Sequence, residues 1–304
     1  MKRPKLITVS GPTAIGKTSF AVALAKHLGC PILSSDARQF FKEMQIGTAV
    51  PTADEQQGVK HYFIQHKSIH DPYSVGDFEK DAIALLDTLF ETFDVVILVG
   101  GSNLYTDAVV HGLDTFPDVS EAIATMWQNA FKTKGLVHLQ DELKRLDPAY
   151  FEVVDTQNHV RLLRALSVCT ASGKPYSSFL GQPKKLRSFE TVSIELTMNR
   201  EKLYERINTR VDLMIENGLV AEAKTLLSYK NLNALQTVGY RELLPYFDGK
   251  QLLEKSIENI KTNTRRFAKR QLTWLRNHPV MFKLPYNSAI DKELLETLGL
   301  EKRI

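Results

Sequence analysis

The chain has few cysteines and no long apolar stretch, and these absences narrow its class. No part of the sequence approaches about 18 consecutive apolar residues, so we expect no transmembrane helix and no membrane partner. The two cysteines, Cys30 and Cys169, lie in apolar surroundings and are expected to be buried thiols of a reducing compartment, not a disulfide or a metal site. Residues 1–4 lead directly into the first predicted strand, which leaves no room for a signal peptide. These features predict a cytoplasmic protein.

A strong imbalance of charge is also missing, as are internal repeats and low-complexity segments. The net charge is only +4, which by itself says little about partners. The apolar content of 43% and the charged content of 24% are ordinary for a soluble globular enzyme. A length of 304 residues is long for one domain and short for two large ones. The distribution of charge is therefore more informative than its total.

The most specific motif of the sequence lies near its start. Residues 11–18 read G-P-T-A-I-G-K-T, which matches the phosphate-loop pattern G-x-x-x-x-G-K-T. A strand is predicted directly before it, at 6–10, and a helix directly after it, at 19–28, as the motif requires. The loop directs backbone N–H groups and the positive end of the helix at an anion, Lys17 adds a full charge, and Thr18 can ligate Mg²⁺. We therefore expect a diphosphate or triphosphate to be bound by Gly11, Pro12, Thr13, Ala14, Ile15, Gly16, Lys17 and Thr18.

The acidic residue that usually accompanies a phosphate loop is missing. Most such NTPases have a later strand that ends in a carboxylate and orients Mg²⁺. The best later strand, 94–99, is followed by G-G-S-N-L-Y instead, and Asp94 stands at its other end. A second acidic candidate is Asp36, which follows the predicted strand 30–35 at the end where parallel sheets bind their ligands. Asp36 could be a general base, a group that organises a metal, or only a turn or helix-capping residue.

The pattern of predicted elements changes twice along the chain. Strands and helices alternate in residues 1–113, as in a parallel α/β domain. From 114 to 190 the sequence predicts helices joined by polar turns, and a strand at 191–196 then returns to the sheet. Everything after residue 200 is predicted to be helical. We therefore expect an α/β fold: a phosphate-loop parallel-sheet core formed by 1–113 and 191–304, a helical insertion domain at 114–190, and a helical C-terminal region.

A predicted helix near the C-terminus carries charge of one sign. Residues 260–279 contain no acidic residue and six basic ones: Lys261, Arg265, Arg266, Lys269, Arg270 and Arg276. On a helix these fall on one half of the surface. The opposite half is expected to be buried and holds Ile257, Ile260, Phe267, Gln271, Trp274 and Leu275. Solvated faces usually mix both signs, so a basic face on a nearly neutral protein favours RNA or phosphate binding over a purely solvated surface.

Together these segments resemble the tRNA dimethylallyltransferases, the isopentenyl transferases of bacterial tRNA. The resemblance extends over nearly the whole chain, and its most specific part is T-R-R-F-A-K-R-Q-L-T-W-L-R at 264–276. Some positions depart from the family pattern: Ala37 stands where Ser is common, Phe40 stands where Tyr is usual, and no Lys or Arg lies between Thr106 and Phe131. The other matching segments are 11–18, 34–40, 46–49, 77–78, 100–105, 161–166, 203–218 and 238–240.

The resemblance implies an enzyme that transfers a dimethylallyl group from dimethylallyl diphosphate to the exocyclic amine of the adenine directly 3′ of the anticodon in tRNA. It implies that the phosphate loop cradles diphosphate and not a nucleotide, with Mg²⁺ bridging the diphosphate and Thr18. No γ-phosphate then has to be activated, which would explain the missing acidic residue. Asp36 matches the general base, and Ser102 takes the place of a usual Thr near the leaving group. Arg210 matches an Arg that neutralises the departing diphosphate.

Contacts with the tRNA anticodon stem-loop are implied at two matching segments, 36–39 and 158–161, and are expected on the basic helix from its charge. The protein is expected to act as a monomer. The residues expected to bind tRNA are Asp36, Ala37, Arg38, Gln39, Ser102, Asn158, His159, Val160, Arg161, Arg265, Arg266, Lys269 and Arg270.

Three other functions stay open on the residues alone. A small-molecule kinase that uses ATP would account for the phosphate loop, but not for the basic helix or the G-G-S strand end. A prenyltransferase of free adenine nucleotides would have little need for the insertion or the basic helix. A non-catalytic RNA-binding module would not need an intact G-K-T together with Asp36.

Overall fold

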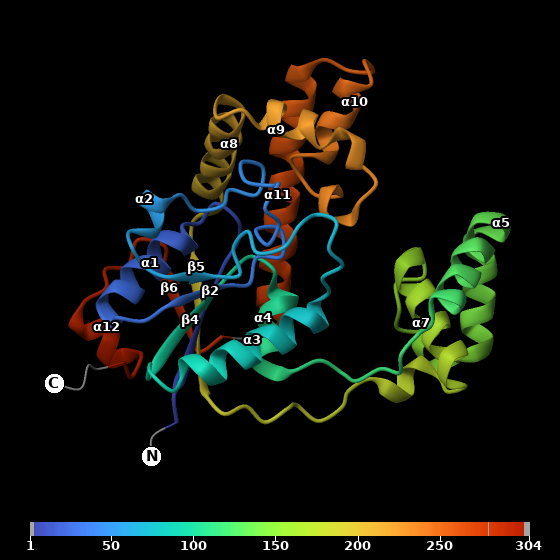
Figure 1. Ribbon diagram of the computed structural model, residues 1–304, viewed down its shortest axis with the longest axis horizontal. Helices are drawn as coiled ribbons and strands as arrows, with labels where there is room; N and C mark the ends of the chain where they lie inside the picture. The colour runs from blue at the N-terminus through green and yellow to red at the C-terminus, as the bar shows by residue number, and fades with distance from the viewer. Residues whose placement is uncertain (1–2, 279, 301–304) are drawn as a thin grey trace. The chain divides into compact units, whose positions relative to one another are not determined.

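A parallel β-sheet lies at the centre of the fold (Figure 1). The computed structural model describes residues 3–278 and 280–300. Within them all strand pairs are parallel, and β1 lies between β4 and β5, with Ile7 opposite both Ile97 and Val192. The predicted phosphate-loop α/β fold with a parallel sheet is confirmed. In their order across the sheet, the strands are β3 (His61–Tyr62), β2 (Ile32–Ser34), β4 (Val95–Val99), β1 (Lys5–Ser10), β5 (Glu190–Thr197) and β6 (Phe282–Pro285).

Helices cover both faces of the sheet, because successive strand residues point to opposite sides. Leu6 and Leu98 pack with α3 and α4 on one side, whereas Ile7 and Ile97 pack with α1 and α8 on the other. Strands that are buried on both faces are apolar almost throughout, which is why the sequence marks them so clearly. The long helices of this part are α1 (Lys17–Leu28), α3 (Val75–Leu89), α4 (Asn103–His111), α8 (Arg200–Glu216) and α11 (Leu253–Asn277).

The chain after residue 200 is not helical throughout, so that prediction is wrong at one element. Strand β6 pairs in parallel with β5, with Phe282 opposite Ile194. Its four residues alternate between half-buried and exposed, and their partner lies far away in the sequence, so no local pattern marks the strand. The shorter elements of the core unit are α2 (Ala53–Gln56), α9 (Leu219–Thr225), α10 (Leu244–Phe247), α12 (Lys292–Thr297) and the 3-10 helices Leu227–Tyr229, Asn233–Leu235 and Arg241–Leu243.

A second hydrophobic cluster ties the C-terminal helices to a loop that follows β2. Met44 from this loop packs with Val211 of α8, Leu219 of α9, Leu243 and Ile260 of α11. The loop that carries residues 41–50 is therefore anchored on the helical region. Among residues 3–278 and 280–300, no helix is long and apolar enough to cross a membrane.

Residues Gly112–Lys185 form a separate compact unit of helices. Gly135, with φ 78° and ψ −172°, breaks its long helix α5 into two segments. The insertion was predicted at 114–190, whereas the sheet-containing unit resumes at Leu186 and β5 begins at Glu190. A role of this unit in tRNA binding stays a prediction. Its elements are α5 (Glu121–Leu146), α6 (Pro148–Phe151), α7 (His159–Ser172) and the 3-10 helix Tyr176–Phe179.

Candidate active site

The turn between β1 and α1 has the backbone of a phosphate-binding loop. Gly11, Ala14 and Gly16 have φ angles of 147°, 65° and 107°, a region that glycine adopts easily and other residues rarely. The helix α1 begins directly afterwards, at Lys17. Backbone N–H groups and the positive end of the helix are thus available to an anion at this point. The loop lines a cavity of about 1270 Å³, which is the candidate active site.

Lys17 lies folded against the loop that it follows. Its Nζ donates hydrogen bonds to the carbonyl oxygens of Gly11 and Pro12, both at 3.0 Å. An ammonium group has a third donor, which these two bonds leave for a ligand. Burial lowers the pKa of Lys17 to about 8, while Asp36 raises this pKa and Arg210 lowers it. The charge of Lys17 is therefore expected to change in the mildly alkaline range.

Asp36 follows β2 and lines the same cavity. Its Oδ1 accepts the backbone N–H of Arg38 at 3.1 Å, so the residue closes a turn as well as facing the cavity. A Cβ atom on Gly101 would lie 3.5 Å from Asp36 Oδ2 and 3.9 Å from Lys17 Nζ. The carboxylate and the ammonium group therefore meet at Gly101, in the pair of glycines that follows β4.

One face of α8 adds basic side chains to the cavity. Lys202, Arg206 and Arg210 are spaced four residues apart, so they share one side of the helix, and all three line the cavity. Arg206 Nε donates to the carbonyl oxygen of Ala14 at 2.8 Å, and Arg210 Nη1 lies 3.5 Å from Thr13 Oγ1. Arg210 is thus placed beside the phosphate loop. Sequence reasoning missed Arg206, although its spacing of four residues from Arg210 was a usable signal.

The segment that carries Asp36 is held by its neighbours. Ser102 Oγ accepts the backbone N–H of Ala37 at 3.1 Å and so supports the turn. Arg38 and Gln39 both donate to backbone carbonyl oxygens of neighbouring loops. These contacts give the segment a fixed backbone, while its predicted contacts with tRNA stay predictions.

Glu222 holds a loop that forms another wall of the cavity. Its carboxylate accepts the backbone N–H groups of Gln45, Ile46 and Gly47 at 3.0, 2.8 and 3.0 Å, and the hydroxyl of Tyr240 at 2.5 Å. A Cβ atom on Gly47 would lie 2.5 Å from the Tyr240 ring, so a larger residue requires a shift. Sequence reasoning marked both segments without giving Glu222 a role. The apolar residues that line this part of the cavity are Ile46, Val50, Leu213 and Met214.

The basic helix is α11, and its charged residues fall into two groups. Lys261 pairs with Asp212 at 2.7 Å and Arg265 donates to Asn208 Oδ1 at 2.6 Å, so both turn toward α8. The prediction of one continuous basic surface is therefore too broad. The exposed members are Arg266, Lys269, Arg270 and Arg276.

The predicted buried half of α11 needs one correction, at Phe267. Its side chain is 36% exposed and lines the cavity. The helical repeat places Phe267 toward the protein, but at this point the protein presents a cavity and not packed side chains. Gln271 and Leu275 are buried, as predicted.

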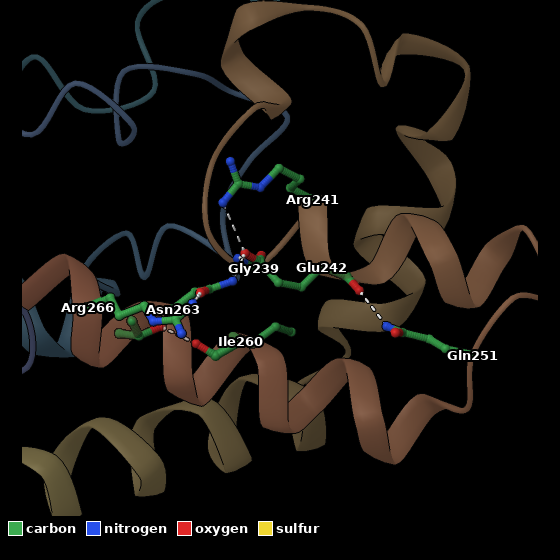
Figure 2. Close-up of polar contacts among 8 residues, drawn as sticks. Gly239, Arg241, Glu242, Gln251, Ile260, Asn263 and Arg266 are labelled. Carbon is green, nitrogen blue, oxygen red and sulfur yellow. Dashed lines mark hydrogen bonds and ion pairs between the residues drawn. The ribbon is translucent and has the colours of Figure 1, made fainter. Parts of the chain in front are cut away.

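Arg266 is oriented by hydrogen bonds that lead to a buried carboxylate (Figure 2). Arg266 Nη1 donates to Asn263 Oδ1 at 3.2 Å, and Asn263 Nδ2 donates to Glu242 Oε1 at 2.8 Å. Glu242 is 6% exposed, accepts the N–H of Gly239 at 2.9 Å and lies 3.5 Å from Arg241. Because each amide and carboxylate in this network has a partner, the amide of Asn263 is fixed and Arg266 keeps one direction.

The other residues expected to contact tRNA, 158–161, lie in the unit Gly112–Lys185 at the start of α7. Asn158 caps this helix by accepting the N–H of Arg161 at 3.3 Å. The ring of His159 stacks on Phe131 with centroids 4.7 Å apart, and Val160 is exposed. The polar and aromatic groups of this segment thus already have partners within the unit.

A metal ion at the cavity would depend on its ligand. In the part of the chain that the structure describes, no group of three or more His, Cys, Asp or Glu side chains is placed to hold a metal. Thr18 lines the cavity and offers a hydroxyl oxygen. Mg²⁺ keeps few protein ligands when phosphate oxygens are present, so this donor set suits Mg²⁺ bound together with a diphosphate.

Comparisons with known proteins agree with this site. The family model described as IPP transferase matches residues 39–278. The tRNA dimethylallyltransferase of Christiangramia forsetii is 54% identical over 274 residues, which cover 90% of this chain and 91% of the relative. That of Flavobacterium johnsoniae is 52% identical over 279 residues, with 90% of each chain covered. The crystal structure of full-length tRNA isopentenylpyrophosphate transferase from Bacillus halodurans is 36% identical, with a TM-score of 0.71, and covers 98% of this chain and 95% of the other. The chain therefore belongs to the IPP transferase family of enzymes, which the tRNA dimethylallyltransferases represent among its relatives.

Proposed function

We propose that the chain transfers a dimethylallyl group from dimethylallyl diphosphate to the exocyclic amine of the adenine 3′ of the anticodon in tRNA and releases diphosphate. The observation that carries this proposal is the convergence of Lys17, Arg210 and Asp36 on one cavity. Two cations are placed for a departing diphosphate, and a carboxylate is placed for a proton. The names of the relatives support the same pair of substrates, because they combine tRNA with dimethylallyl transfer.

The phosphate loop and α8 act on the donor. Negative charge builds on the diphosphate as the allylic C–O bond breaks, and Lys17 and Arg210 are placed to stabilise it. Arg206 lies close enough to the loop to contribute to the same charge. Bound Mg²⁺, held by Thr18 and by diphosphate oxygens, would neutralise more of this charge. The apolar wall near Ile46 offers the dimethylallyl group a place away from water.

Asp36 acts on the acceptor. An adenine amine is a poor nucleophile because its lone pair is conjugated with the ring. As the N–C bond forms, the amine becomes acidic, and Asp36 takes its proton as general base. Extruding the adenine from the stacked anticodon loop costs a few kcal/mol. Contacts between RNA phosphates and the exposed residues Arg266, Lys269 and Arg270 would offset this cost.

The experiment that tests the proposal varies the donor and the acceptor separately. The protein is incubated with Mg²⁺, unmodified tRNA and dimethylallyl diphosphate, and the digested nucleosides are analysed by mass. We expect one adenosine to gain a dimethylallyl group. Parallel reactions contain ATP in place of the donor, or adenosine monophosphate in place of tRNA, and should give no product. Phosphoryl transfer from ATP would favour a kinase, and equal prenylation of the free nucleotide would favour a small-molecule prenyltransferase.

A further inference from the structure

We propose that Gln271 is a positioning residue of the diphosphate site: its side-chain amide joins the phosphate loop to the glycine pair after β4 and fixes both. Gln271 belongs to α11 and is 5% exposed. This inference rests on the proposed function, because it assumes that the phosphate loop holds the diphosphate of the donor.

The amide of Gln271 bonds to two different loops of the cavity. Its Oε1 accepts the backbone N–H of Thr13 at 2.9 Å, and its Nε2 donates to the carbonyl oxygen of Gly101 at 2.7 Å. Thr13 belongs to the loop after β1 and Gly101 to the turn after β4, and both line the cavity. These orientations of the two amide atoms are mutually consistent, since a backbone N–H needs an acceptor and a carbonyl needs a donor. One uncharged side chain therefore satisfies two backbone groups that no strand pairing reaches.

The space that Gln271 occupies is created by the missing side chain of Gly101. A Cβ atom on Gly101 would lie 2.8 Å from Gln271 Nε2, too close for a side chain to stay in place. The same position is 3.5 Å from Asp36 Oδ2 and 3.9 Å from Lys17 Nζ. The amide, the carboxylate and the ammonium group thus surround one glycine. Any shift of this glycine or of the loop would change the distances between the groups that act on the diphosphate and on the amine.

The chemistry of the position explains why an amide is suited to it. A carboxylate could accept from Thr13 but could not donate to Gly101, and its charge would oppose a diphosphate. An apolar side chain would leave a buried N–H and a buried carbonyl without partners, which is costly. The opposite side of α11 exposes Arg266, Lys269 and Arg270. Gln271 therefore links the helix that faces RNA to the loop that faces the diphosphate.

The first test replaces Gln271 with Met, which is similar in length and lacks both polar atoms, and uses Leu275→Val as a control. Leu275 is buried on the same helix one turn later, so its truncation disturbs packing without touching either loop. We expect Gln271→Met to accelerate hydrogen exchange of the Thr13 amide by at least about tenfold. The affinity for inorganic diphosphate with Mg²⁺ should fall by roughly tenfold to a hundredfold. The KM for tRNA should stay unchanged in both variants, and Leu275→Val should affect neither exchange nor diphosphate binding.

Gln271→Glu separates positioning from simple loss of structure. The carboxylate can still accept from Thr13, so exchange of this amide should stay slow, yet diphosphate binding should weaken because a negative charge has been added beside it. A general loosening of the loop would instead change both quantities together in every variant, and that result would overturn the proposal.

Gly101→Ala provides a second route if Gln271→Met folds poorly. Its Cβ should displace the amide of Gln271 and accelerate exchange of Thr13 as Gln271→Met does, and in the double variant the two effects should not add. Equal diphosphate affinity and equal exchange in wild type, Gln271→Met and Gly101→Ala would refute the proposal alone. If the wild type binds diphosphate no better than Lys17→Ala does, the proposed function fails first, and this inference fails with it.

Discussion

Binding of the diphosphate should weaken as the pH rises through about 8, because Lys17 then loses its charge. Burial lowers the pKa of Lys17 from 10.5 to about 8 in the ligand-free protein. A bound diphosphate favours the charged form and raises this pKa, so binding at higher pH requires uptake of a proton. With only the protonated form binding, the dissociation constant grows as one plus ten to the power of pH minus pKa. Between pH 7 and pH 9.5 this factor amounts to about thirtyfold for a pKa near 8.

The assay is titration calorimetry with a non-reactive thiolo analogue of dimethylallyl diphosphate at several pH values and constant ionic strength. The last ionisation of a phosphate ester lies near about pH 6, so the charge of the ligand is nearly constant over the alkaline half of the range. Lys17→Arg is the matched control, because a guanidinium stays charged throughout and its affinity, even if lower, should not depend on pH. An equally steep loss of affinity in Lys17→Arg, or a flat profile in the wild type up to pH 9.5, would refute this reasoning.

Three further predictions concern the base, the RNA surface and the loop clamp. Asp36→Asn should lower kcat by about 10²–10⁴-fold with tRNA affinity nearly intact, measured in single-turnover reactions; a normal chemical step would exclude Asp36 as the base. Replacing both Arg266 and Arg270 with Glu should weaken tRNA binding and flatten its salt dependence by about 0.7 to 0.9 log units per lost phosphate contact, without a large change in melting temperature. Loss of diphosphate binding with intact tRNA binding would instead place these residues at the donor. Glu222→Ala should lower the free energy of unfolding by about 3 kcal/mol, since it leaves three backbone N–H groups unpaired; a change below about 1 kcal/mol in urea unfolding would contradict the role of this clamp.

The features that the sequence predicted correctly have local signatures. The phosphate loop is one continuous motif between a strand and a helix, and the central strands are continuous apolar runs because both faces of the sheet are covered. The basic helix also carries its own periodic pattern. Strand β6 has no such signature, because its only partner, β5, is distant in the sequence and its residues are half exposed.

The features that the sequence did not predict depend on contacts between distant segments. The helical repeat of α11 separates polar from apolar residues, but it cannot show that Phe267 faces a cavity while Gln271 reaches into two loops. Likewise, Lys261 and Arg265 share the charge of their exposed neighbours, and only the position of α8 turns them away from solvent. In each case the residue type is visible in the sequence, and its partner is supplied by the fold.

The most direct test of the central claim is mass mapping of two anticodon stem-loop RNAs that differ at one nucleotide. One carries adenine 3′ of the anticodon, and the other carries a purine without the exocyclic amine at the same position. Each is incubated with the protein, Mg²⁺ and dimethylallyl diphosphate and is then digested and sequenced by mass. We predict one dimethylallyl group on that adenine, none on the RNA without the amine, and none on either RNA with Lys17→Ala. A dimethylallyl group on the RNA that lacks the amine, a group at another nucleotide, or full activity of Lys17→Ala would contradict the account.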